Sequence, residues 1–269
     1  MAAFLVLAAL AAPPIFADRD VAYGDHRLQT VDVYSSLAGS GRPVMVVVHG
    51  GGWKIGDKKS AADKAAPLAG EGGFVLASVN YRLVPEVGWR DQAADVAAAV
   101  AKVRSAAADY GGNPDRVFLV GHSAGAHLAA LVATDPRYLK PHGLRPGDLS
   151  GAILLDGAGY DVAAQAEAAG PTAKRLYREV FGDDAAELRA ASPLTHAASP
   201  GSPPMLIAYV SDRAASEAQA KRLADTLSEA GGRARVLSVD GTHSSIYRNF
   251  GHAGDPVFPA AREFFGRPE

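Results

Sequence analysis

Six short apolar runs constrain the fold of this chain more than any other feature. They begin near residues 44, 75, 117, 151, 205 and 235, and each has the length of a β-strand: VMVVVH, VLASVN, VFLVGH, GAILLD, MLIAYV and RVLSVD. Stretches with helical spacing separate them, most clearly at residues 91–109 and 216–230. This alternation predicts an α/β fold with a mostly parallel central sheet flanked by helices.

The chain length fits one domain of this kind, because 269 residues suit a single α/β domain with insertions. Two alternating runs, DVAYG and TVDVY around Val21 and Val31, predict antiparallel edge strands before the parallel ones. Residues 159–204 are too long for a simple crossover, and helical character at 172–181 and 184–191 indicates a small cap-like insertion. We therefore expect one domain over residues 18–269.

The first seventeen residues, MAAFLVLAALAAPPIFA, form an apolar stretch that ends in small residues and prolines. This pattern is typical of the hydrophobic and cleavage regions of a secretory signal peptide, although no Lys or Arg precedes the apolar run. The part before Pro13 is short for a membrane span. We expect a secreted or periplasmic protein slightly more than a cytoplasmic one with a buried N-terminal segment.

Charge and cysteine content exclude several classes of function. The formal net charge of -2, without a run of Lys or Arg, provides no positive field for nucleic acid or for an anionic membrane surface. The absence of cysteine excludes a thiol nucleophile, a disulfide framework and a thiolate metal site. No H-E-x-x-H motif accompanies the histidines, so we expect no metal and no cofactor, and a small molecule as the partner.

The pentapeptide GHSAG at residues 121–125 is the first motif that suggests chemistry. It follows the run VFLVGH and precedes the helical stretch AGAHLAALVA. A G-x-S-x-G sequence between a strand and a helix is the pattern that exposes a nucleophilic serine, so Ser123 is the candidate nucleophile. Taken alone, the serine fits a helix N-cap equally well.

The second motif, HGGGW at residues 49–53, follows the run VMVVV. Successive glycines adopt backbone angles closed to other residues, so their N–H groups can converge on an oxyanion. We expect Gly51 and Gly52 to act as donors together with the amide of Ala124. A phosphate cradle is the weaker alternative, since no P-loop or dinucleotide spacing is present. Trp53 and His122 are candidates for the substrate pocket, although Trp53 alternatively anchors the loop.

A serine nucleophile needs a base, and the base needs an acid that orients it. His243 follows the run RVLSVDGT, and Asp212 follows MLIAYVS. Both lie just past strand ends, and in a parallel sheet these ends share the edge that carries Ser123. We therefore expect His243 to be the base and Asp212 to be the acid.

Three other aspartates are alternatives for the acid. Asp156 and Asp161, in LLDGAGYD, follow the preceding strand and lead into the cap-like segment. Asp156 fits better as a hydrogen-bonding residue of the loop, and Asp161 as a helix N-cap. Asp240, three residues before His243, is the runner-up if Asp212 proves dispensable.

Together, HGGGW, NYRLVPE, GHSAGAH, SDR and GTHSSI resemble the carboxylesterase branch of the α/β-hydrolase superfamily. The similarity is strongest to bacterial acetyl and feruloyl esterases and to the kynurenine formamidase-like group, and it runs from about Val21 to the C-terminus. It implies a serine carboxylesterase that works through an acyl-enzyme, with a triad of Ser123, His243 and Asp212. The sequence has no obvious lid of long apolar helix, which favours short-chain esters over the substrates of an interfacial lipase. The segment DRAASEAQ departs from the Pro- and Val-rich sequence that often follows the acid in the family.

Two other functions remain open from the sequence. An arylformamidase or amidase would use the same triad, because amides pass through the same tetrahedral intermediate. A non-catalytic binding protein of the same fold is the third alternative.

Overall fold

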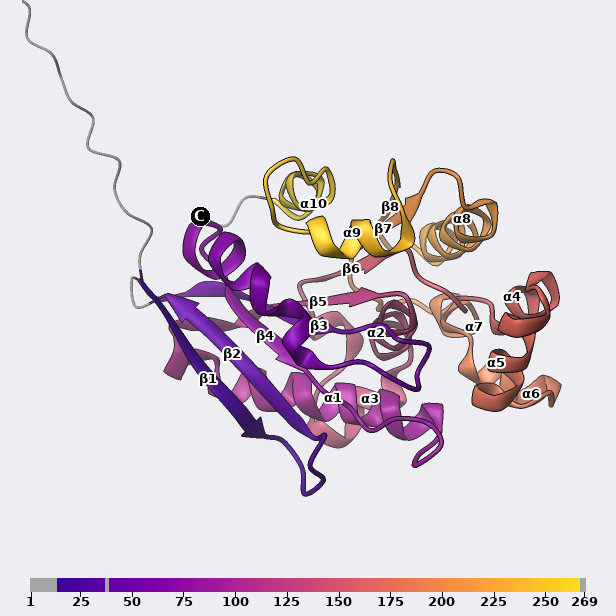
Figure 1. Cartoon of the computed structure of the whole chain (residues 1–269), viewed down its shortest axis with the longest axis horizontal. Helices are drawn as coiled ribbons and strands as arrows, with labels where there is room; N and C mark the ends of the chain where they lie inside the picture. The colour runs from indigo at the N-terminus through magenta and orange to yellow at the C-terminus, as the bar shows by residue number, and fades with distance from the viewer. Residues whose placement is uncertain (1–13, 37–38, 267–269) are drawn as a thin grey trace, which may run out of the picture.

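The computed structural model describes residues 14–36 and 39–266, which are built around an eight-stranded sheet (Figure 1). The strands lie in the order β1-β2-β4-β3-β5-β6-β7-β8. The predicted fold is confirmed: β3 to β8 pair in parallel, and β1 and β2 are antiparallel at one edge. The bounds of the strands are β1 (Ile15–Ala22), β2 (Thr30–Ser36), β3 (Arg42–Val48), β4 (Val75–Val79), β5 (Gly112–His122), β6 (Gly151–Leu155), β7 (Met205–Val210) and β8 (Ala234–Val239).

The parallel strands are apolar on both faces because helices cover both. Alternate residues of one strand enter two different cores: Val44, Val46 and Val48 of β3 pack on one side, and Met45 and Val47 on the other. The first core is covered by α1 (Trp89–Ala106), α2 (Ala124–Thr134), α3 (Pro136–Leu139) and α8 (Ala214–Glu229). The second is covered by the short helical segments Lys58–Lys64 and Ala65–Glu71, α9 (His243–Asn249) and α10 (Val257–Phe265).

Residues 159–204 contain four helices, which lie at the right-hand end of the molecule in Figure 1. They are α4 (Val162–Ala168), α5 (Pro171–Phe181), α6 (Ala185–Ala191) and α7 (Pro193–Ala197). The two helices expected here are α5 and α6. Pro171 is the first residue of α5, where its fixed φ suits the helix, and Gly182 ends α5 with a φ of 76°. We call α4, α5 and α6 the cap helices.

Most of the candidate signal peptide lies outside the described residues, which begin at residue 14. Its last three residues, 15–17, belong to β1 and pair with Ser36, Ser35 and Tyr34 of β2. Export therefore stays a prediction from the sequence. Among the helices of the described residues, none is long and apolar enough to cross a membrane.

Candidate active site

The candidate nucleophile Ser123 occupies a tight turn between β5 and α2. Its φ of 55° is rare for a residue with a side chain, and strain of this kind is common at functional positions. The flanking glycines allow the close approach, since a Cβ on Gly121 or Gly125 would lie 2.3 Å from a backbone oxygen. The Ser123 side chain makes no capping hydrogen bond to α2, which argues against the N-cap alternative.

His243 is the residue that the Ser123 hydroxyl contacts. Its Nε2 lies 3.0 Å from Ser123 Oγ, and 35% of its side chain is exposed. His243 is the first residue of α9, whose N-cap Thr242 accepts a hydrogen bond from the backbone N–H of Ser245. The cap fixes the start of the helix, so the imidazole is held by regular structure instead of by the loop that the sequence suggested.

The carboxylate that contacts His243 belongs to Asp156, and the structure does not place the predicted Asp212 beside His243. Asp156 Oδ2 lies 2.5 Å from His243 Nδ1, and the Asp156 side chain is fully buried. Asp212 is exposed. The reason is positional: Asp156 comes directly after β6, next to β5 in the sheet, whereas Asp212 comes two residues after β7 and points to solvent.

The backbone around Asp156 directs its carboxylate to this place. The φ of Asp156 is 42°, its N–H donates to the Ala208 carbonyl at 2.7 Å, and its Oδ1 accepts from the Val210 N–H at 3.3 Å. Burial opposes ionisation of Asp156, but the His243 hydrogen bond and the charge of Arg213 hold its pKa below the usual value. The carboxylate is therefore ionised and fixed.

The other two aspartates serve elsewhere. Asp161 is the N-cap of α4, as expected, and its carboxylate also pairs with Arg222 at 2.8 Å. Asp240, directly after β8, accepts a hydrogen bond from the Ser211 hydroxyl at 2.8 Å, and this contact is exposed to solvent. Neither carboxylate contacts His243. Arg213, which sequence reasoning missed, pairs with Asp156 at 2.9 Å.

The glycine loop after β3 lies beside Ser123. A Cβ on Gly50 would be 3.0 Å from the Ser123 Cβ, and Gly51 and Gly52 have φ values of 121° and 60°. Ala124 is the first residue of α2, so its N–H has no acceptor within the helix and points toward the turn with the positive end of the helix dipole. This arrangement favours an anion beside Ser123. Gly51, Gly52 and Ala124 remain the predicted oxyanion donors.

Trp53 anchors this loop instead of lining an open pocket. Only 2% of Trp53 is exposed, and its indole N–H donates to His127 Nδ1 at 3.1 Å. The second ring nitrogen of His127 lies 2.8 Å from the Ala191 carbonyl, so His127 is neutral with its proton on Nε2. Burial lowers the pKa of His127 to about 4. The structure thus supports the anchoring alternative for Trp53.

His122 packs against His243 and Tyr247. Its ring stacks on Tyr247 and lies 4.7 Å from the His243 ring, centroid to centroid, while its Nε2 is 2.7 Å from the His243 carbonyl. Burial, together with the nearby His243, lowers the pKa of His122 to about 4. A neutral His122 adds no positive charge beside the base. Contact of His122 with a substrate stays a prediction.

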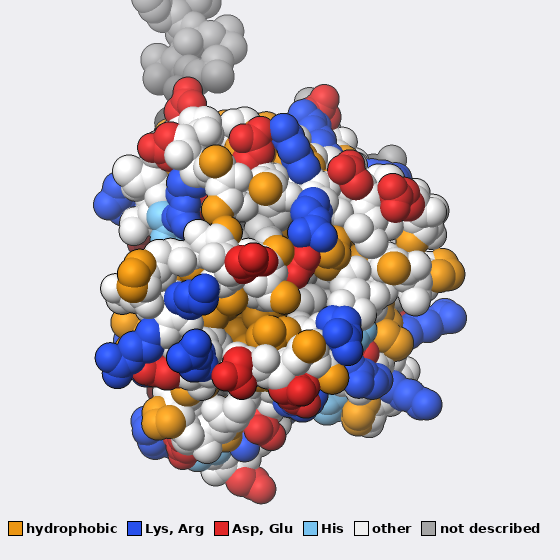
Figure 2. All heavy atoms as spheres, turned by 90° about the vertical axis from the view of Figure 1, so that its right-hand side faces the viewer, with side chains coloured by type: hydrophobic (Ala, Val, Ile, Leu, Met, Phe, Trp, Pro, Cys, Tyr) orange, Lys and Arg blue, Asp and Glu red, His pale blue; other side chains and the backbone are white. Residues whose placement is uncertain are grey.

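Cap helix α5 packs directly on the glycine loop. A Cβ on Gly52 would be 3.2 Å from Leu176, the Glu179 carboxylate pairs with Lys54 at 2.6 Å, and the rings of Tyr177 and Phe181 pack edge-on against Trp53. Figure 2 shows this end of the molecule, where apolar side chains gather near the centre among charged side chains of both signs. The cap therefore contributes apolar surface close to the predicted oxyanion donors.

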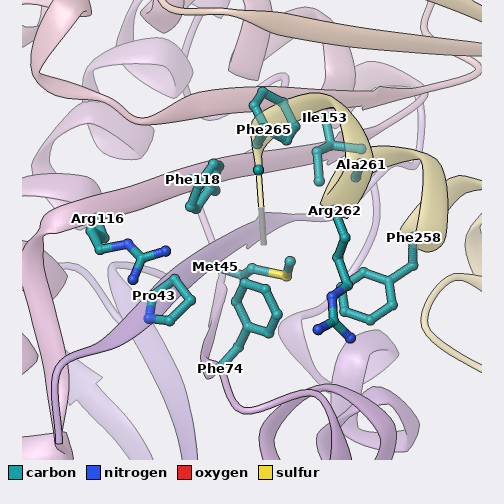
Figure 3. Close-up of a pocket in the computed structure, with 11 residues that line it drawn as sticks. Pro43, Met45, Phe74, Arg116, Phe118, Ile153, Phe258, Ala261, Arg262 and Phe265 are labelled. Atoms are coloured by element: carbon teal, nitrogen blue, oxygen red, sulfur yellow. The ribbon is translucent and has the colours of Figure 1, made fainter. Parts of the chain in front are cut away.

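A separate, small hollow lies on the α10 side of the sheet, away from Ser123 (Figure 3). Phe74, Phe118, Phe258 and Phe265 are among the residues that line it. It holds no nucleophile and no pair of acid and base, so it offers no catalytic chemistry. Among the described residues, no group of three His, Asp or Glu side chains is placed to hold a metal ion.

Several known proteins that are similar to this chain are named as esterases. The BD-FAE family model matches residues 31–227. Esterase LipQ of Mycobacterium tuberculosis is 32% identical over 228 residues, which cover 79% of this chain and 53% of LipQ. A probable isoprenylcysteine alpha-carbonyl methylesterase of Arabidopsis thaliana, ICMEL1, is 29% identical over 252 residues, covering 85% of this chain and 51% of the relative. The chain thus spans about half the length of these curated relatives.

Solved structures show the same fold. The butyrate-bound esterase Est2 of Thermogutta terrifontis is 25% identical with a TM-score of 0.72, and the match covers 94% of this chain and 96% of Est2. Esterase B of Lactobacillus rhamnosis is 20% identical with a TM-score of 0.75, over 93% of this chain and 83% of that one. The resemblance to α/β-hydrolase carboxylesterases is confirmed, and the chain belongs to the BD-FAE family.

Proposed function

We propose that this protein is a serine carboxylesterase in which Ser123 is the nucleophile, His243 the base and Asp156 the acid. One observation carries the proposal: a continuous line of contacts runs from Ser123 Oγ to His243 Nε2 at 3.0 Å, and from His243 Nδ1 to Asp156 Oδ2 at 2.5 Å. A hydroxyl in this arrangement can transfer its proton as it attacks, and the buried carboxylate stabilises the imidazolium that forms.

The reaction proceeds by two acyl transfers. Ser123 Oγ bonds to the ester carbonyl carbon while its proton moves to His243 Nε2, and the oxyanion is stabilised by the amides of Gly51, Gly52 and Ala124. The C–O bond to the alcohol then breaks, and the alcohol leaves with the proton from Nε2. Water attacks the acyl-enzyme, gives one proton to Nε2, and the carboxylic acid leaves as the serine recovers that proton.

We propose short-chain carboxylic esters as the substrate class. The support is the contact of α5 with the glycine loop: Leu176 stands against Gly52, and an apolar side chain beside the predicted oxyanion donors would limit the room for a long acyl chain. The names of the curated relatives as esterases agree with ester hydrolysis. A formamide or amide substrate would use the same residues, and this alternative is an outcome of the test below.

The test is hydrolysis of p-nitrophenyl esters from acetate to palmitate by the wild-type protein and three variants. Ser123→Ala should leave only a residual rate, and Asp156→Asn should lower kcat by about a thousandfold to ten-thousandfold. The matched control, Asp212→Asn, removes an exposed carboxylate and should leave kcat unchanged. Loss of activity in Asp212→Asn with retention in Asp156→Asn would refute the proposed triad.

A fluorophosphonate probe separates the remaining alternatives. Labelling of Ser123 without turnover of any ester would favour a formamide or amide substrate. Failure of the probe to label Ser123 would favour a non-catalytic binding protein of this fold.

A further inference from the structure

Arg213 shares the oxygen of Asp156 that orients the base. Arg213 Nη1 lies 2.9 Å from Asp156 Oδ2, the atom that also lies 2.5 Å from His243 Nδ1. The Asp156 side chain is 0% exposed and that of Arg213 is 39% exposed, so the guanidinium reaches from the surface to a buried carboxylate. Arg213 follows β7, in the loop where the sequence predicted the acid.

The backbone holds Arg213 in place independently of this ion pair. It is the N-cap residue of α8, its N–H donates to the Val210 carbonyl at 3.0 Å, and its carbonyl accepts from the Glu217 N–H at 3.0 Å. The loop is therefore tied to both β7 and α8. A guanidinium on such a fixed backbone is pre-organised for a carboxylate.

Several charged or titratable groups face this pair from the surrounding elements. His243 of α9 and His122 at the end of β5 lie beside each other, and His122 is neutral at ordinary pH. Tyr160, after β6, and Tyr177 of α5 are buried phenols whose pKa values burial raises, so both are uncharged. Asp156 is the carboxylate with which Arg213 forms an ion pair among the described residues.

We propose that Arg213 is a positioning residue that fixes the Asp156 carboxylate and reduces the stabilisation it gives to the His243 imidazolium. The inference rests on the proposed function. The Arg213 guanidinium lies on the same Asp156 oxygen as the imidazole, so it offsets part of the negative charge that would stabilise a protonated His243. Without the guanidinium, the same carboxylate would stabilise the imidazolium more strongly.

Removal of the guanidinium should therefore have two effects. The acid limb of the pH profile of kcat/KM should move to higher pH by about half a unit to one unit, because protonation of the imidazole becomes easier. The plateau value should fall by about tenfold, because the carboxylate loses a contact that fixes its orientation. Loss of a merely structural residue would lower the plateau without moving the limb.

The experiment compares Arg213→Ala, Arg213→Lys and the matched control Arg222→Ala. Hydrolysis of a p-nitrophenyl ester is followed at the isosbestic wavelength of p-nitrophenol and p-nitrophenolate, so that the signal does not depend on pH. Arg222 lies in α8, the helix for which Arg213 is the N-cap residue, but it pairs with Asp161. We expect the shifted limb in Arg213→Ala, its partial recovery in Arg213→Lys, and the wild-type profile in Arg222→Ala. An unshifted limb in Arg213→Ala, or an equal shift in Arg222→Ala, would overturn the proposal.

A titration of the His243 ring by NMR in wild type and Arg213→Ala repeats the comparison without any substrate. A shift to higher pH in the variant supports the role of Arg213 even if no tested ester is hydrolysed, which would count against the proposed function alone. Coincident titration curves in a protein with serine-dependent esterase activity would overturn the role of Arg213 alone.

Discussion

Acidification should destabilise this protein through its buried histidines, of which His127 is the clearest. His127 is fully buried, and its neutral ring accepts the Trp53 N–H and donates to the Ala191 carbonyl. A protonated ring carries a hydrogen on Nδ1 and can no longer accept from Trp53. Acidification therefore acts on the anchor of the glycine loop as well as on the stability of the fold.

The size of the effect follows from the pKa of His127, which falls from 6.5 in the unfolded chain to about 4 in the folded one. Between these values the unfolded state binds the proton and the folded state does not. The contribution of the neutral His127 ring to the free energy of unfolding is present in full above pH 6.5, and it is lost as the pH falls to about 4. This difference corresponds to about 3 kcal/mol, with a slope of about 1.4 kcal/mol per pH unit.

The assay is urea unfolding of the wild type and of His127→Gln at several pH values between 7 and 4. His127→Gln removes the titrating ring. The slope of its free energy of unfolding against pH should therefore be smaller than the wild-type slope by about 1.4 kcal/mol per pH unit. Trp53→Phe is the control, because it removes the same hydrogen bond and leaves the imidazole. Equal slopes in wild type and His127→Gln would refute the reasoning.

The remaining predictions concern the loop and the cap. Gly51→Ala should lower kcat by about a hundredfold to a thousandfold in the ester assay, because a Cβ there would lie 2.0 Å from the Ile55 carbonyl oxygen and displace a predicted oxyanion donor; wild-type kcat would contradict this. Leu176→Ala should raise kcat/KM for hexanoate relative to acetate by about tenfold, and an unchanged ratio would show that Leu176 does not limit the acyl chain. Lys54→Ala should leave the urea midpoint of unfolding nearly unchanged, since its pair with Glu179 is half-exposed and solvent screens it; a clear drop in the midpoint would show that the pair holds the cap in place.

The sequence predicted the elements whose signals are local. The apolar runs marked the six parallel strands, and the glycines beside Ser123 marked the nucleophile turn, because strand length and close backbone approach depend on adjacent residues. The start of α9 at His243 was missed, since seven residues with a Thr242 cap give a weak helical pattern.

The contact between Asp156 and His243 was missed for a different reason. Asp156 and Asp212 both follow strands, and the choice between them depends on where each loop turns after its strand. Asp156 adopts a φ of 42° immediately after β6, and no sequence pattern predicts this conformation for an aspartate. The available signals were the position of Asp156 directly at a strand end and the unusual segment DRAASEAQ after Asp212.

The position of Asp156 also bears on how such a protein can evolve. The cap-like segment begins at residue 159, three positions after the acid, and its α5 touches the glycine loop. In many enzymes an inserted segment can be exchanged between relatives to change the substrate while the chemistry is inherited unchanged. Here one end of the cap-like segment adjoins Asp156, the proposed acid. Replacing the segment to gain a new specificity would therefore preserve turnover only if residue 156 kept its place.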